Sequence, residues 1–254
     1  MPEIRIYPSD HLAGKAAIHW VELAQESVAR RGRFSAVLAG GSTPKATYAK
    51  LANPDFSQRV DWTRVHVFWG DERCVPAVHP NSNYFMAYET WLRHVPIPAE
   101  NIHRLPGEMD PQTAAAEYET TLRAFFAGEA IPQFDLVLLG LGDDGHTASL
   151  FPGTAAIDER ERWVIGQYVE KLAAWRLTLT PMAINGARDV TFLVSGLAKA
   201  PMLHQVLTAA YEPERLPAQV VRPAQGRVLW LVDEAAASQL SSDGKRSVPD
   251  FLPM

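Results

Sequence analysis

Short apolar runs that alternate with stretches of helical periodicity constrain the fold of this chain more than any other feature. Runs such as 34–39, 65–69 and 134–139 are typical of buried strands, because bulky apolar residues are continuous there and turn residues bound them. Between the runs, apolar residues recur at helical spacing, as they do from Leu12 to Val28. Repeated strand–helix units predict an α/β fold: a doubly wound, mainly parallel, Rossmann-like sheet with helices on both faces.

The same alternation continues through the chain. The expected strands cover residues 4–7, 34–39, 65–69, 134–139, 176–180, 190–194 and 228–232. The expected helices cover residues 12–31, 44–53, 83–94, 112–126, 197–209 and 233–240. For the second helix, Thr43 is the predicted N-cap and Pro44 the first helical residue. Ligands of parallel sheets bind beyond the carboxyl ends of the strands, so we expect a site among the polar segments that follow them.

Length and composition indicate one large domain. The chain has 254 residues, of which 47% are hydrophobic and 21% charged, so we expect a single domain over 1–254 with a loosely held tail at 241–254. The net charge of -5 argues against general binding to nucleic acids or anionic membranes. Cys74 is the single cysteine, which excludes an internal disulfide and suits a reducing compartment. No segment resembles a signal peptide or reaches the roughly 20 apolar residues that span a bilayer. We therefore expect a cytoplasmic protein, whose oligomeric state the sequence does not specify.

The segment LLGLGDDGHTASLFPG (138–153) has the G-x-G-x-x-G spacing of a dinucleotide-binding turn. A dinucleotide site also needs a long helix after the glycines and a second strand that ends in an acidic residue. Pro152 would stop any helix after about two turns, and the residues beyond it are charged and unlike a strand. We therefore expect the glycines to form a tight strand-to-helix turn, capped by Asp143 or Asp144, and not a nucleotide site.

His146 is the residue of this segment that a turn alone does not explain. It lies where a short helix is expected to begin, at the carboxyl edge of the sheet and two residues after Asp144. A nearby carboxylate can orient an imidazole and stabilise its protonated form. The two side chains are therefore a candidate acid–base pair, and a turn cap is the alternative role for Asp144.

Seven segments, which follow one another along nearly the whole chain, together resemble the 6-phosphogluconolactonase family. They are LAGGSTP (38–44), FWGDER (68–73), SNY (82–84), LGLGDDGHTASLFPG (139–153), RLTLT (176–180), SGLAKA (195–200) and LWLVDEAA (229–236). The resemblance implies a carboxylic ester hydrolase that converts 6-phosphoglucono-1,5-lactone to 6-phosphogluconate in the oxidative pentose phosphate pathway. It implies a small sugar phosphate as the partner and neither a metal nor an organic cofactor.

The resemblance also implies a role for each candidate residue. His146 matches the family's proposed general base, and Asp144 would orient its imidazole or contact sugar hydroxyls. Backbone N–H groups of the glycine turn could stabilise the oxyanion. A glycine-rich turn at a helix N-terminus favours an anion, so the phosphate is expected to bind Gly40, Gly41, Ser42 and Thr43, together with the cations Arg73, Arg176 and Lys199.

Each cation has a simpler structural alternative. Arg73 could pair with Asp71 or Glu72, Arg176 could be a surface charge at a strand end, and Lys199 could be a solvated helix lysine. Such roles would require no ligand.

Three other functions remain as alternatives. The glucosamine-6-phosphate deaminases and isomerases of the same superfamily resemble the pattern D-G-H-I-A-F-N-E-P-G, with a glutamate where this chain has Phe151. A non-catalytic sugar-phosphate-binding protein would usually need an attached DNA-binding module, for which the chain has no spare length. A metal hydrolase would use Asp143, Asp144 and His146, but no recognised metal-ligand spacing supports it.

Overall fold

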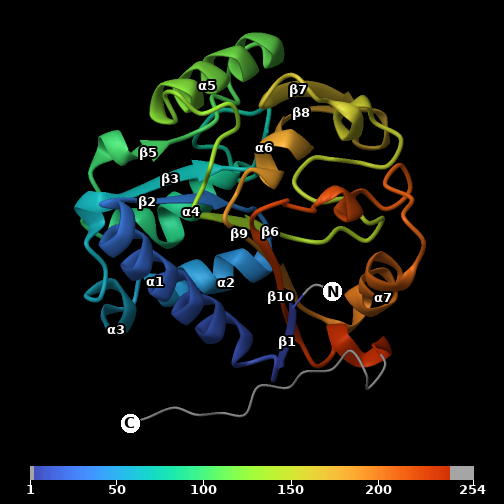
Figure 1. Ribbon diagram of the computed structural model, residues 1–254, viewed down its shortest axis with the longest axis horizontal. Coiled ribbons are helices and arrows are strands. Elements are labelled where there is room, and N and C mark those ends of the chain that lie inside the picture. The colour runs from blue at the N-terminus through green and yellow to red at the C-terminus, as the bar shows by residue number, and fades with distance from the viewer. Residues whose placement is uncertain (1–2, 241–254) are drawn as a thin grey trace.

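Parallel strand pairing brings the carboxyl ends of seven strands to one edge of a sheet (Figure 1). The computed structural model describes residues 3–240, so the tail expected at 241–254 lies outside the described residues. The strand order is β1-β10-β9-β6-β2-β3-β5, and every pairing is parallel. The strands are β1 (Glu3–Tyr7), β2 (Phe34–Leu38), β3 (Val65–Trp69), β5 (Ile102–His103), β6 (Leu136–Leu139), β9 (Asp189–Val194) and β10 (Arg227–Asp233).

Helices cover both faces of this sheet. Figure 1 shows α1 and α2 on one side and α5 on the other. The α-helices are α1 (Leu12–Arg31), α2 (Ser42–Leu51), α3 (Pro54–Ser57), α4 (Asn83–Thr90), α5 (Pro111–Phe125), α6 (Pro181–Asn185) and α7 (Ala200–Thr208). This arrangement confirms the predicted doubly wound α/β class.

Aromatic side chains fill much of the core between the sheet and its helices. Trp20 of α1 meets Phe34 of β2 edge-on at a centroid distance of 5.0 Å, and Trp91 at 5.2 Å. Elsewhere, Phe68 of β3 meets Phe134 at 5.4 Å. All five side chains are fully buried. Buried aromatic side chains bring large apolar areas into contact, so these clusters hold the sheet and its carboxyl edge as a rigid support.

A second sheet was not expected from the sequence. The strand expected at 176–180 is present as β8 (Ala174–Leu179), but it pairs antiparallel with β4 (Asp71–Arg73) and β7 (Val164–Val169). The outer half of β8 is partly exposed and only its last three residues are buried. Such one-sided burial is typical of an antiparallel sheet with one solvated face.

Several expected helix boundaries are wrong. Helix α2 begins at Ser42 with Gly41 as its N-cap, not at Pro44 with Thr43 as N-cap. Gly41 has φ +103°, and this left-handed backbone is accessible to glycine and turns the chain two residues earlier than a cap at Thr43 would.

Two of the expected helices are absent. No helix follows the glycine segment, because residues 141–149 form turns and the only pairing there is an isolated bridge between Thr147 and Leu150. The closing helix expected at 233–240 is a short 3-10 turn, Ala236–Gln239, although the carboxylate of Asp233 accepts the N–H of Ala236 at 2.7 Å, as a helix N-cap does.

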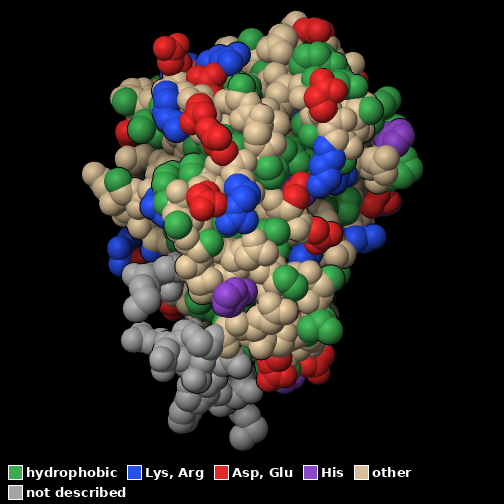
Figure 2. Space-filling model, turned by 90° about the vertical axis from the view of Figure 1, so that its right-hand side faces the viewer, with side chains coloured by type: hydrophobic (Ala, Val, Ile, Leu, Met, Phe, Trp, Pro, Cys, Tyr) green, Lys and Arg blue, Asp and Glu red, His purple; other side chains and the backbone are tan. Residues whose placement is uncertain are grey.

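The helices at 83–94 and 197–209 each divide into an α-helix and a 3-10 turn. These turns are Leu92–His94, after α4, and Leu197–Lys199, before α7. Within residues 3–240, no helix combines the length and hydrophobicity needed to cross a bilayer. On the face shown in Figure 2, basic and acidic side chains are interspersed, which argues against a broad basic surface there.

Candidate active site

Turns that leave the carboxyl ends of β2, β3 and β6 surround a polar hollow of about 260 Å³. Gly40 and Gly41 follow β2, Asp71 follows β3, and the segment 140–143 follows β6. An adjoining hollow of about 330 Å³ shares part of this lining and extends to Arg176 in the second sheet. The site therefore lies where ligands of parallel sheets are expected, and between the two sheets.

Most of the predicted site residues come together here. His146, Gly40, Gly41, Arg73 and Lys199 line the first hollow, and Asp144 and Arg176 line the second, together with His146 and Arg73. Ser42 and Thr43 line neither hollow. They lie in the first turn of α2, whose N-cap Gly41 offers no side-chain hydrogen bond. The first-turn N–H groups consequently lack a capping side chain and point toward the Gly40–Gly41 side of the site.

The side chains of His146 and Asp144 are directly bonded. Oδ1 of Asp144 lies 2.5 Å from Nδ1 of His146 and accepts the backbone N–H of the same residue at 3.2 Å. Asp144 therefore caps the turn and orients the imidazole at once. Its other oxygen, Oδ2, accepts a hydrogen bond from Nζ of Lys171 at 2.7 Å. Burial alone would raise the pKa of Asp144, but the hydrogen bonds from Lys171 and His146 outweigh it and lower the pKa to about 2.

The glycine spacing makes room for the His146 ring. A Cβ on Gly142 would lie 2.0 Å from Nδ1 of His146, so the imidazole lies directly against the Gly142 backbone. The N–H of Gly142 donates to the carbonyl of His146 at 2.8 Å, and Gly145 has φ +81°. On its other side the imidazole stacks on Phe151, with ring centroids 4.2 Å apart. The turn thus holds a histidine and not a dinucleotide.

Two amides of this turn are already used within it. The N–H of Gly142 bonds the His146 carbonyl, and the N–H of Gly145 bonds the Gly142 carbonyl at 3.1 Å. The expectation that the amides of this turn stabilise an oxyanion therefore fails for these two residues.

Glu72 and Asn83 shape the wall opposite His146. A Cβ on Gly40 would lie 2.0 Å from Oδ1 of Asn83, so the missing side chain of Gly40 admits the Asn83 amide. The Glu72 carboxylate accepts hydrogen bonds from the hydroxyl of Ser82 and from the backbone N–H groups of Asn83 and Tyr84. Burial raises the pKa of Glu72, although these bonds partly oppose the rise. Glu72 is therefore the anchor of this wall and not an ion-pair partner of Arg73.

Arg73 and Arg176 face each other across the β4–β8 pairing. Nη1 of Arg73 donates to the carbonyl of Asn81, and Nη1 of Arg176 donates to the carbonyl of Trp175. Neither guanidinium forms an ion pair with a carboxylate of residues 3–240. Burial lowers the pKa of Arg176, and the charge of Arg73 lowers it further. Two adjacent guanidinium groups without a carboxylate partner carry the charge and the N–H donors that suit a phosphate or carboxylate anion.

Lys199 reaches the site from the turn after β9. Its Nζ bonds Oδ1 of Asp143, so in this structure it is paired and not solvated. The turn that carries it is fixed by Asp233 at the end of β10, which accepts the N–H of Gly196 and the hydroxyl of Ser195. In the described part of the chain, no group of three or more His, Cys, Asp and Glu side chains could hold a metal ion.

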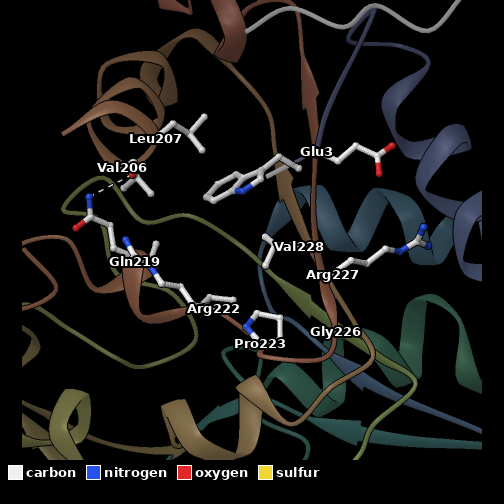
Figure 3. A pocket seen from close by; sticks show the side chains of 12 residues that line it. Glu3, Val206, Leu207, Gln219, Arg222, Pro223, Gly226, Arg227 and Val228 are labelled. Carbon is white, nitrogen blue, oxygen red and sulfur yellow. Dashed lines mark hydrogen bonds between the residues drawn. The ribbon is translucent and has the colours of Figure 1, made fainter. Parts of the chain in front are cut away.

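A larger cavity, of about 690 Å³, lies beside α7 and the start of β10 (Figure 3). Apolar side chains such as Val206 and Trp230 form much of its lining. The Gln219 amide is bonded to the carbonyl of Val206 at 3.2 Å, and Arg227 is paired with Asp189. This lining contains no histidine and therefore no group suited to proton transfer near neutral pH. The smaller polar hollow, which His146 lines, is therefore the candidate active site.

Sequence reasoning did not identify Lys171 or the structural role of Glu72. Lys171 lies at the tip of the β7–β8 hairpin, and no local pattern placed that hairpin near His146. The GDER segment did point to this part of the site, but a single sequence does not show that Glu72 bonds backbone groups eleven and twelve residues away.

Known proteins are similar to this chain in both sequence and fold. The family model described as glucosamine-6-phosphate isomerases/6-phosphogluconolactonase matches residues 8–230. A 6-phosphogluconolactonase of Nostoc is 45% identical over 85% of this chain and 88% of its own. The structure of 6-phosphogluconolactonase from Trypanosoma cruzi superposes with a TM-score of 0.82 and 31% identity, over 95% of this chain and 97% of that one.

The fold alone does not separate the enzymes of this family. A monomeric glucosamine-6-phosphate deaminase superposes with a TM-score of 0.78 at 21% identity, over 93% of this chain and 99% of that one. The choice between the two activities consequently depends on the residues around His146.

The two glycines at 140 and 142 make a matched test of this site. Gly142→Ala forces the imidazole of His146 away from the chain, because the added Cβ lies 2.0 Å from Nδ1. We expect it to break the bond to Asp144 and to cost about 1–3 kcal/mol of unfolding free energy. Gly140→Ala is the control, because a Cβ there meets no atom within 4 Å. Crystal structures and urea unfolding of both variants measure the effects. An unmoved imidazole in Gly142→Ala would contradict this account.

Proposed function

The chain belongs to the glucosamine-6-phosphate isomerase/6-phosphogluconolactonase family, and we propose that it hydrolyses 6-phospho-D-glucono-1,5-lactone to 6-phospho-D-gluconate. One observation carries the proposal. The imidazole of His146, held by Asp144 and stacked on Phe151, lines the same hollow as the unpaired Arg73–Arg176 guanidinium groups. A proton acceptor and a phosphate site are thus within the reach of one small substrate.

His146 acts as the general base in this proposal. With Nδ1–H donated to Asp144, the neutral imidazole keeps its lone pair on Nε2, where it can accept a proton. A water molecule gives one of its protons to Nε2 while its oxygen attacks the lactone carbonyl carbon. The tetrahedral intermediate then breaks the ring C–O bond, and the imidazolium returns the proton to the departing ring oxygen. The products are the free hydroxyl and the carboxylic acid, which ionises. A lactone is an activated ester, so the reaction needs no metal or organic cofactor.

Arg73 and Arg176 bind the phosphate in the proposal. Their charges lie opposite each other on neighbouring strands, and each retains N–H donors for a bidentate contact. Gly40, Gly41, Ser42 and Thr43 add the N-terminal end of α2, whose dipole also favours the anion. Lys199 contributes a further charge when its bond to Asp143 opens to the substrate.

The structure offers a physical reason to prefer a lactonase to a deaminase. Phe151 occupies the position that carries a glutamate in the deaminase pattern, and its ring covers the imidazole. An apolar ring cannot exchange the protons that ring opening and amine loss require. A non-catalytic sugar-phosphate binder would not need the oriented His146–Asp144 pair.

We propose, further, that residues 1–254 act as one catalytic domain in the cytoplasm. The proposal of a reducing compartment is supported by Cys74, the single cysteine of the chain. Its partner is a small sugar phosphate, with no requirement for nucleic acid or membrane.

Lactone hydrolysis measured against the spontaneous reaction tests the function. We expect the protein to accelerate loss of 6-phosphogluconolactone well above the background, to keep doing so after exhaustive chelation, and to release no ammonia from glucosamine 6-phosphate. Ammonia release, or lactone loss at the background rate, would overturn the proposal.

Replacing the proposed base should abolish most turnover without removing binding. His146→Asn loses the proton acceptor, and we expect kcat to fall about 10²- to 10⁴-fold with a small change in KM. The wild type should lose activity at acid pH as the imidazole is protonated, and the variant should lack that dependence. His204→Asn, which alters a histidine of α7 outside both hollows, is the control. Near-normal turnover in His146→Asn would remove His146 from the mechanism.

Phosphate binding is tested by comparing two substrates. Arg176→Ala removes charge-assisted hydrogen bonds, and we expect KM for the phosphorylated lactone to rise about 10- to 100-fold. The unphosphorylated lactone should be affected little. Arg59→Ala, at an exposed position of the α1 side of the sheet, is the control. Equal losses on both substrates would show that Arg176 does not hold the phosphate.

A further inference from the structure

Lys171 and His146 bind the two oxygens of one carboxylate. Nζ of Lys171 donates to Oδ2 of Asp144 at 2.7 Å, while Nδ1 of His146 lies 2.5 Å from Oδ1. The carboxylate is thus held on one side by its own turn and on the other by a separate element of the fold. Rotation of the Asp144 side chain would break one of these bonds, so the lysine fixes the plane of the carboxylate on which the imidazole depends.

The hairpin that presents Lys171 is itself anchored. Lys171 is the middle residue of the 3-10 turn Glu170–Leu172, between β7 and β8. The strands pair in register from Val164↔Leu179 to Val169↔Ala174. Nε2 of Gln167 donates to the carbonyl of Ser149, which ties the hairpin to the loop that follows His146.

A strained residue closes the tip of this hairpin. Ala173 has φ +46°, in the left-handed region that residues other than glycine seldom adopt. Its N–H bonds the carbonyl of Glu170 at 3.0 Å. The surrounding contacts therefore hold the tip in one conformation despite a local cost, and Lys171 has a defined place at the edge of the site.

We infer that Lys171 is a positioning residue for the proposed base His146, acting through Asp144. The inference rests on the proposed function. The ammonium group holds Asp144 in the plane that bonds Nδ1, and it partly neutralises the carboxylate. A carboxylate without a cationic partner would stabilise the imidazolium form more strongly. The neutral imidazole would then be the main form only at higher pH. Lys171 therefore reduces the net negative charge beside the imidazole.

Other charged groups near the pair come from every element around the site. They are Asp71 and Arg73 on β4, Arg176 on β8, Asp143 in the glycine turn, Lys199 before α7 and Glu170 at the hairpin tip. None of these changes when Lys171 is replaced, so an altered pH profile reports the loss of one ammonium group.

Loss of an ion pair with only a structural role would change the stability of the fold and not the pH profile of the reaction. The Lys171 side chain is 66% exposed, and exposed ion pairs contribute little to stability. Replacement should therefore leave the unfolding transition almost unchanged. A lysine that bound substrate directly would instead raise KM. Only a positioning residue changes kcat and the pH profile together.

Three single variants test the inference in the lactonase assay. We expect Lys171→Met to lower kcat about 3- to 10-fold with KM nearly unchanged, and to move the acid limb of the pH profile upward by about half a pH unit. Lys171→Arg keeps the positive charge, so it should retain most of the wild-type kcat and the wild-type acid limb. Lys50→Met, an exposed lysine at the end of α2, is the control. An unchanged acid limb, or a rise in KM alone, would overturn the inference.

A double-mutant cycle shows whether the effect passes through Asp144. In an Asp144→Asn background, Lys171→Met should lower kcat no further, because the link to the imidazole is already broken. Independent, additive losses in the two variants would contradict a role through Asp144.

An NMR titration of the His146 ring separates this inference from the proposed function, because it needs no substrate. The ring signal is assigned by its absence in His146→Asn. A midpoint about half a pH unit higher in Lys171→Met than in wild type supports the inference even if the protein proves not to be a lactonase. Identical midpoints would overturn it even if the lactonase assay succeeds.

Discussion

The contact between the His146 imidazole and the bare backbone of Gly142 determines the rest of the site. The ring lies where the Cβ of any other residue would be. It is then held at its edge by Asp144 and on its face by Phe151. A glycine-rich turn after a parallel strand usually brings an anion close to the backbone. Here the missing Cβ of Gly142 lets the imidazole of His146, and not an anion, lie against the backbone. The turn therefore supports the side chain that we propose as the base.

The two sheets contribute different residues to the candidate site. The parallel sheet supplies the turns that carry His146 and Lys199, and the antiparallel sheet supplies Arg73, Arg176 and the Lys171 hairpin. Facing guanidinium groups repel each other in the free protein. A phosphate bound between them, as we propose, would relieve that repulsion, and the charges that attract it are already in place in the free protein.

Sequence patterns predicted the features that local chemistry controls. Apolar runs located every strand of the parallel sheet except the two-residue β5, and the carboxyl ends of these strands located the candidate site. The pairing of His146 with Asp144 followed from their spacing of two residues. Two features that the patterns missed depend on contacts between distant segments. The side chain of Glu72 and the hairpin at Lys171 act on residues that lie far from them in the sequence, and no local pattern encodes such contacts. The helix expected after the glycine segment is absent because the turn closes on His146.

The central claim is that one hollow holds the phosphate on Arg73 and Arg176 while the reacting carbon faces His146. A crystal structure with bound 6-phosphogluconate tests it most directly. The account predicts the phosphate between the two guanidinium groups and a carboxylate oxygen of the sugar acid about 2.7–3.2 Å from Nε2 of His146. A phosphate bound elsewhere, or a carboxylate turned away from the imidazole, would contradict it.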